Sequence, residues 1–197
     1  GGCALQHLAP EAQVRFKQKQ LVDALARIGK VAPEQLAEPI TGPVWGYRRR
    51  ARMGAKWVFN KHTVLVGFRE RRTHFLAELS RCPVLDPRVG EALEVLAEAL
   101  ANTSIADKIP QIEMAAAEHV CLSIRVLQAP TEADLQVFRQ LARDTGFELR
   151  LQPGGLSTIT PLDPPARVLD YSPDGSARRL QFEIADFIQV NGFICQR

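Results

Sequence analysis

Three stretches of the chain carry apolar residues at the spacing of an α-helix, and they predict helices over residues 10–29, 88–101 and 129–146. The apolar face of the first is Val14, Leu21, Leu25 and Ile28, and that of the second is Val89, Leu93, Leu96 and Leu100. The third has clear end signals: Thr131 is a suitable N-cap, Asp134 lies at the capping-box position, and Gly146 follows as a C-cap.

Other stretches alternate apolar and polar residues or are rich in β-branched and aromatic side chains, which is typical of strands. They lie at residues 47–60, 62–71, 73–79, 111–128, 147–152, 166–172 and 178–184. Asn60–His62 is expected at the turn of one hairpin, and residues 111–128 are expected to form another. The order of these elements predicts an α+β fold, in which an antiparallel β-sheet has packing helices on one side.

The composition is that of an ordinary globular protein, with 197 residues, 46% hydrophobic and 24% charged. No apolar run reaches the length of about 20 residues that a membrane span needs, and the first thirty residues lack the pattern of a signal peptide. We therefore expect a soluble, cytoplasmic protein with no membrane partner. Both ends are expected to be cut, because Phe193 and Ile194 begin a helix that stops after one turn.

Positive charge is concentrated in one segment. Residues 47–82 contain ten Lys or Arg and two acidic residues, a net charge of +8, whereas the whole chain carries only +3. Within "YRRRAR", Arg48, Arg50 and Arg52 are expected on one face of a strand and Arg49 on the other. Tyr47, Trp57 and Phe59 are interleaved with these charges. Guanidinium groups beside aromatic rings favour RNA binding, and a solvated charged face is the alternative.

The four cysteines are too sparse for a secreted disulfide framework. Cys82 lies in a Cys-Pro step, which is common beside iron–sulfur clusters, and Cys3 follows two glycines. Two cysteines so far apart do not by themselves make a metal motif, so from spacing alone they are ligands or incidental thiols. Cys121 alternates with apolar neighbours and is expected in the core, and Cys195 has no assigned role.

The segment "DFIQVN" ends in a polar residue directly before a predicted helix, so Asn191 is a suitable N-cap. Gln189 carries an amide that both donates and accepts, which suits a base edge or a cofactor. Phe187 could stack on a base. The alternative for this segment is that it serves only as core and cap.

Taken in order, several of these fragments resemble one family. "YRRRAR", "VGFRER", "CPVLDP" and "LQFEIADFIQVNGFICQR" are similar to the RumA (RlmD) type of RNA uracil-C5-methyltransferase, as is "CALQHLAPEAQVRFKQKQLVDALARIG". The resemblance runs over nearly the whole chain, and "DFIQVN" is its most specific marker. It implies that the parent protein uses S-adenosylmethionine to methylate a uridine of 23S ribosomal RNA.

The resemblance also implies site residues. Cys3 and Cys82 match the third and fourth ligands of a [4Fe-4S] cluster whose first two cysteines would precede Gly1. Gln189, with Phe187 beside it, matches residues that contact S-adenosylmethionine or the flipped uridine. The residues expected to bind RNA are Arg48, Arg49, Arg50, Arg52, Lys56, Arg69, Arg71 and Arg72. None of the four cysteines matches the nucleophile, so no catalytic residue is expected in this chain.

The same resemblance divides the chain into three parts. Residues 1–30 would be the end of an iron–sulfur loop plus a helix that packs on the catalytic domain. Residues 31–185 would form a central RNA-positioning domain, and residues 186–197 the start of the methyltransferase domain. On this hypothesis the chain is silent alone and binds neither cluster nor cofactor. The alternatives are a non-catalytic RNA-binding module, or part of a transfer-RNA uracil-5-methyltransferase.

Overall fold

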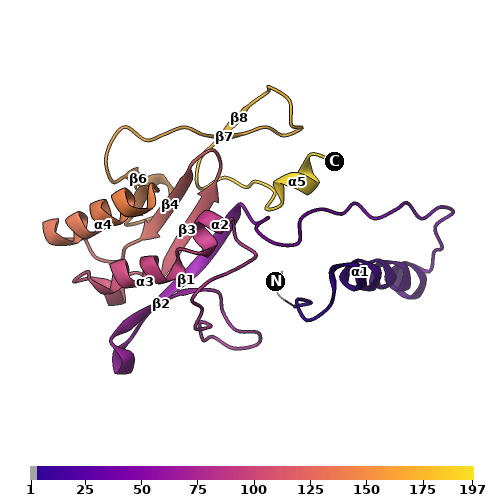
Figure 1. Cartoon of the computed structure of the whole chain (residues 1–197), viewed down its shortest axis with the longest axis horizontal. Coiled ribbons are helices and arrows are strands. Elements are labelled where there is room, and N and C mark those ends of the chain that lie inside the picture. Colours follow the sequence, from indigo (N-terminus) through magenta and orange to yellow (C-terminus); the bar gives the residue numbers. More distant parts are fainter. Residues whose placement is uncertain (1–3) are drawn as a thin grey trace.

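A six-stranded sheet forms the centre of the protein, in a computed structural model that describes residues 4–197 (Figure 1). Its strand order is β2-β1-β3-β4-β5-β6. The strands are β1 (Arg50–Val58), β2 (Thr63–Gly67), β3 (Gln111–Ala116), β4 (Val120–Arg125), β5 (Glu148–Gln152) and β6 (Thr160–Pro161). All neighbours are antiparallel except β4 and β5, which are parallel because α4 (Glu132–Thr145) connects them.

One face of the sheet is apolar and carries the core. Strand residues that point to this face include Met53, Ile112, Met114, Leu122 and Ile124, all fully buried. The helices α3 (Leu93–Ala101) and α4 cover them, and the same hydrophobic cluster includes Leu96, Leu100, Phe138 and Leu141. The predicted α+β class, with helices on one side of a largely antiparallel sheet, is confirmed.

The opposite face of the sheet is polar, and the end of the chain covers part of it. A separate two-stranded sheet, β7 (Leu169–Tyr171) and β8 (Leu180–Phe182), lies beyond the main sheet. It supplies Leu169 to a second small cluster with Ala115, Cys121 and Ile184. The core position expected for Cys121 is therefore confirmed, but in this second cluster rather than the main core.

The N-terminal helix stands apart from the sheet. α1 (Pro10–Ala24) continues as one π-helical stretch, Leu25–Gly29, so the helix over residues 10–29 is confirmed. No residue of it is buried, and Ile28 is 83% exposed. Residues 30–45, here called the arm, contain no helix or strand and join α1 to the rest of the chain (Figure 1).

Two predicted elements differ from the structure. The helix over 88–101 is two helices, α2 (Pro87–Gly90) and α3, because the Gly90 carbonyl accepts the Cys82 N–H at 2.9 Å instead of a helical one. The strand over 73–79 is wrong: only one bridge forms, between Arg69 and Leu76. Arg72 in the connecting turn has φ +65°, which breaks the extended geometry.

The other predicted elements are present. The hairpins around residues 60–62 and in 111–128 correspond to β1–β2 and β3–β4. Thr131 and Asp134 form the capping box of α4, and Gly146 is its left-handed C-cap. Asn191 caps the short α5 (Gly192–Cys195) by accepting the Ile194 N–H at 3.1 Å. In the part of the chain from residue 4 onward, no helix is long and apolar enough to cross a membrane.

Candidate RNA interface

The two residues directly before β1, Arg48 and Arg49, connect three parts of the chain through their backbone. Arg48 donates its N–H to Val84, accepts the Asp86 N–H, and forms a bridge with Asn191 on its other side. Arg49 donates its N–H to the Val190 carbonyl at 2.9 Å. The "YRRRAR" run therefore lies between the Cys82 loop and the segment that carries Phe187 and Gln189.

Two arginines of β1 share one carboxylate. Glu113 on β3 is 5% exposed, and it pairs with Arg50 at 2.7 Å and with Arg52 at 2.8 Å. Arg50 is almost buried and also donates to the Met114 and Ile184 carbonyls. The side chain of Arg52 is 66% exposed, so the far side of its guanidinium faces solvent. Arg52 can accept a further anionic partner, whereas the donors of Arg50 are largely used within the protein.

Arg49 points toward the end of the chain. Its Nε donates to the Gln189 carbonyl at 2.8 Å, and its guanidinium carbon lies 4.4 Å from the centre of the Tyr171 ring. Arg48 makes one long hydrogen bond, 3.5 Å from Nη1 to the Arg50 carbonyl. The four arginines of "YRRRAR" thus have different surroundings, although their sequence context suggested one role.

Phe187 and Gln189 lie on either side of a buried residue, Ile188. Ile188 between them is 3% exposed, whereas Phe187 is 82% exposed and Gln189 is also exposed. The buried side chain of Ile188 thus lies between two exposed neighbours. Phe187 and Gln189 therefore both lie on the surface of the protein.

The remaining predicted RNA-binding residues are exposed. Lys56 lies on β1, with Nζ 5.9 Å from the centre of the Phe75 ring, and Arg69, Arg71 and Arg72 lie in the loop after β2. Within the described chain, from residue 4, these four side chains form no salt bridge. Unpaired surface cations of this kind suit contacts to phosphates.

The cysteines are not gathered at a metal site in the described residues. Cys82 is 5% exposed and lies at the start of the loop that leads into α2, and Cys3 lies outside the described residues. From residue 4 onward, no group of three or more His, Cys, Asp or Glu side chains could hold a metal ion. Burial raises the pKa of the Cys121 thiol to about 12, so that thiol is neutral at physiological pH.

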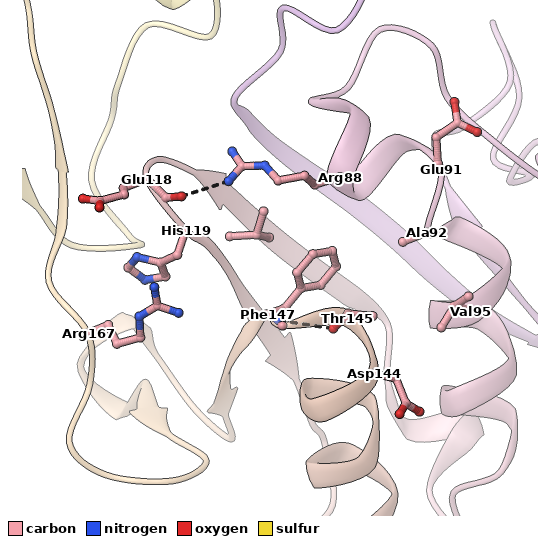
Figure 2. A pocket seen from close by; sticks show the side chains of 12 residues that line it. Arg88, Glu91, Ala92, Val95, Glu118, His119, Asp144, Thr145, Phe147 and Arg167 are labelled. Atoms are coloured by element: carbon pink, nitrogen blue, oxygen red, sulfur yellow. Dashed lines mark hydrogen bonds between the residues drawn. The ribbon is translucent and has the colours of Figure 1, made fainter.

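A pocket of about 520 Å³ lies beside the turn of the β3–β4 hairpin (Figure 2). The sequence did not predict this pocket. His119 in its wall is 8% exposed and lies 3.1 Å from Glu148, which also pairs with Arg150 at 2.7 Å. Burial, aided by the charge of Arg167, lowers the pKa of His119 despite the Glu148 carboxylate. No sequence pattern marks this cluster, because its members come together only when β4 pairs with β5.

The chain is similar to known proteins over nearly its whole length. No family model matches the chain. It is 47% identical over 196 residues to the 23S rRNA (uracil(1939)-C(5))-methyltransferase RlmD of Alkalilimnicola ehrlichii, and 43% identical over 197 residues to that of Alcanivorax borkumensis. Each match covers 98% of this chain and 44% of the relative. The RlmD of Cupriavidus pinatubonensis is 40% identical, with 98% and 42% covered.

Over nearly its whole length the chain is therefore similar to part of proteins that are named as RNA uracil-C5-methyltransferases. Within that class, the relatives that it resembles are named RlmD. The resemblance inferred from its motifs is confirmed. The chain spans less than half the length of the relatives it matches.

Proposed function

We propose that this chain is the RNA-positioning region of an S-adenosylmethionine-dependent 23S rRNA uracil-C5 methyltransferase. The observation that carries the proposal is the match to relatives named for this activity over 98% of the chain. Those relatives are named for ribosomal RNA, which favours it over transfer RNA. A non-catalytic RNA-binding module remains the second candidate, favoured by the exposed cations around β1 and the loop after β2.

The proposed RNA contacts are the cations with free or exposed donors, here called the basic surface: Arg48, Arg52, Lys56, Arg69, Arg71 and Arg72. They would bind phosphates and set the orientation of the RNA without selecting sequence. Arg49 and Arg50, predicted as phosphate contacts with the others, have donors already engaged by carbonyls and a carboxylate. We therefore expect them to contribute less to RNA affinity than the basic surface does.

The proposed contacts to the reacting groups are Gln189 and Phe187. An exposed amide and an exposed ring two residues apart can hydrogen-bond and stack on S-adenosylmethionine or on a flipped uridine. C5 of uracil becomes nucleophilic only after a nucleophile adds to C6, and in the family that the chain resembles this nucleophile is a cysteine thiolate. The buried, neutral Cys121 does not fit that role, and we propose that none of the four cysteines is the nucleophile.

Cys3 and Cys82 remain proposed ligands of a [4Fe-4S] cluster. A cubane needs four thiolates, and the described residues bring only Cys82 to this loop, so they do not fit a complete cluster. We assign no chemical step to it.

α1 is proposed to pack on a catalytic domain. The apolar side chains Phe16 and Leu21 of α1 are 42% and 56% exposed, and Ile28 in the π-helical stretch after it is 83% exposed. A groove of about 1550 Å³ lies between α1 and the arm and is lined partly by apolar residues of both. Residues 31–185 would then be the RNA-positioning domain, and residues 186–197 the entry to the catalytic one.

RNA affinity measured against salt tests the proposal. Replacing Arg69, Arg71 and Arg72 with Ala should flatten the slope of log affinity against log salt by about 2, since each lost single-strand phosphate contact removes about 0.7. A matched control replaces Lys108, Arg139 and Arg143, on the helix-covered side, and should leave the slope unchanged. Equal slopes for both triple variants would show that the loop after β2 does not contact RNA phosphates.

Methylation by the full-length protein separates the two candidate functions. With a 23S rRNA fragment and labelled S-adenosylmethionine, the enzyme hypothesis predicts transfer of label to uracil C5. RNA binding without transfer would instead support the binding module.

A further inference from the structure

Three arginines hold residues 183–190 against the polar face of the main sheet: Arg50 on β1, Arg150 on β5, and Arg49 directly before β1. Arg150 pairs with Glu183 at 3.0 Å, and Arg50 donates to the Ile184 carbonyl. Arg49 donates from Nε to the Gln189 carbonyl, and its backbone N–H donates to Val190. Residues 183–186 form a turn in which the Asp186 N–H donates to the Glu183 carbonyl at 2.8 Å, and no residue of 183–190 belongs to a strand. The turn, the arginine contacts and the buried Ile184 and Ile188 therefore hold the segment in position.

The hydrogen bond from the Arg49 side chain reaches the segment at Gln189, next to the exposed side chains of Phe187 and Gln189. It binds the backbone of Gln189 and leaves the side-chain amide free, while Ile188 anchors the preceding residue. A carbonyl held at Gln189 and a side chain held at Ile188 together fix the direction in which Phe187 and Gln189 point. Loss of either contact would let the outward pair rotate about the backbone.

We infer that Arg49 is a positioning residue that holds the Phe187–Gln189 pair in place through the Gln189 carbonyl, rather than a phosphate ligand. The inference rests on the proposed function in assigning that pair to the cofactor or the flipped uridine. Arg49 itself touches no reacting group. It acts through the backbone of the segment.

The surroundings of Arg49 require the shape of a guanidinium and not only its charge. The group stacks on Tyr171 while its Nε–H reaches the carbonyl, a combination that the single-point ammonium of lysine cannot reproduce. Gly192 also lies against the guanidinium of Arg49. A Cβ at Gly192 would lie 2.9 Å from Nη1 of Arg49 and 3.1 Å from its Cζ. Gly192→Ala therefore displaces the guanidinium without removing it.

Hydrogen exchange and kinetics on the full-length protein test the inference. Arg49→Ala and Arg49→Lys should both speed amide exchange in residues 186–191, at least several-fold, and Gly192→Ala should do so to a smaller extent. Both Arg49 variants should lower kcat or raise KM for S-adenosylmethionine about tenfold or more. The salt slope of RNA affinity should stay as in the unmodified protein, and Arg71→Ala provides the contrast because it should flatten that slope.

The outcomes separate the inference from the proposed function. If Arg49→Ala weakens RNA binding, Arg49→Lys restores it, and exchange in 186–191 is unchanged, Arg49 is a phosphate ligand and the inference fails. If exchange rises but the unmodified protein transfers no methyl group to RNA, the positioning contact stands and the proposed function fails. If a variant does not fold, Gly192→Ala, which keeps the arginine, supplies the exchange test.

Discussion

Asp134 connects the N-terminus of α4 to the loop after α3. Replacing it should lower the free energy of unfolding more than replacing any exposed carboxylate on the same helix. The residue is 2% exposed, and its carboxylate accepts four hydrogen bonds. Two come from the N–H and hydroxyl of Thr131, each at 2.8 Å, and two from Ser104, at 2.6 Å for the N–H and 2.8 Å for the hydroxyl. Asp134→Asn removes the charge and turns an NH₂ group toward these donors.

The magnitude follows from the pKa of Asp134. Burial alone would raise this pKa, but the hydrogen bonds from Thr131 and Ser104 outweigh it and lower the value from 3.8 to about 2. Each pKa unit corresponds to 1.36 kcal/mol, so the ionised carboxylate contributes about 2 kcal/mol of stability at neutral pH. In the variant, some of the buried donors of Thr131 and Ser104 also lose their acceptor, which adds a further cost. We therefore expect Asp134→Asn to lower the free energy of unfolding by about 2–4 kcal/mol.

Urea unfolding of the two proteins between pH 7 and pH 2 measures this difference. Because the folded pKa lies below the unfolded one, the stabilisation is complete above about pH 5 and is lost as the pH falls through 3.8 toward 2. The gap between wild type and variant should therefore shrink over that interval. Asp144→Asn, an exposed carboxylate at the other end of α4, should change stability by less than about 0.5 kcal/mol. A gap below about 1 kcal/mol at pH 7, or one that stays constant down to pH 2, would refute the reasoning.

Two further predictions concern the loop at Cys82. A Cβ at Gly90 would lie 2.4 Å from the Cys82 carbonyl oxygen, so Gly90→Ala should destabilise the protein by about 1–3 kcal/mol in thermal unfolding. At Gly155, where a Cβ meets no atom within 4 Å, alanine should have almost no effect, and equal effects would contradict the argument. The 197-residue chain should be colourless and contain far less than the roughly four irons of a cubane, measured by visible absorption and metal analysis. A brown protein with a full iron complement would show that the ligands are mismatched.

Local signals predicted the features of the fold that depend on neighbours in sequence. The capping box of Thr131 and Asp134 lies within one turn, so sequence spacing was enough to identify it. The break in the helix over 88–101 was not predictable in this way. The Gly90 carbonyl is taken by Cys82, and nothing in the apolar stripe indicates that partner.

The candidate RNA interface depends even more on contacts between residues that are distant in sequence. The pattern of "YRRRAR" placed arginines on a strand, but their partners lie far away in sequence: Glu113 is 61 residues from Arg52, and Gln189 is 140 residues from Arg49. Charge and periodicity cannot tell an arginine that pairs with a distant carbonyl from one that faces solvent. The sequence therefore identified the right segment and could not separate the members of the basic surface from Arg49 and Arg50.

The alternating contacts along the start of β1 limit how the gene can change in length. Deleting Ala51 would move the arginines before it by one position relative to the sheet and exchange the faces on which they lie. The arginine that reaches Gln189 would then face Glu113, and the buried Ala51 would be replaced by a charged residue. The arm has exposed side chains and no strand partners, so insertions there add only a small loop-closure cost. Natural length variation among such chains should accumulate in the arm and be absent from the arginine run.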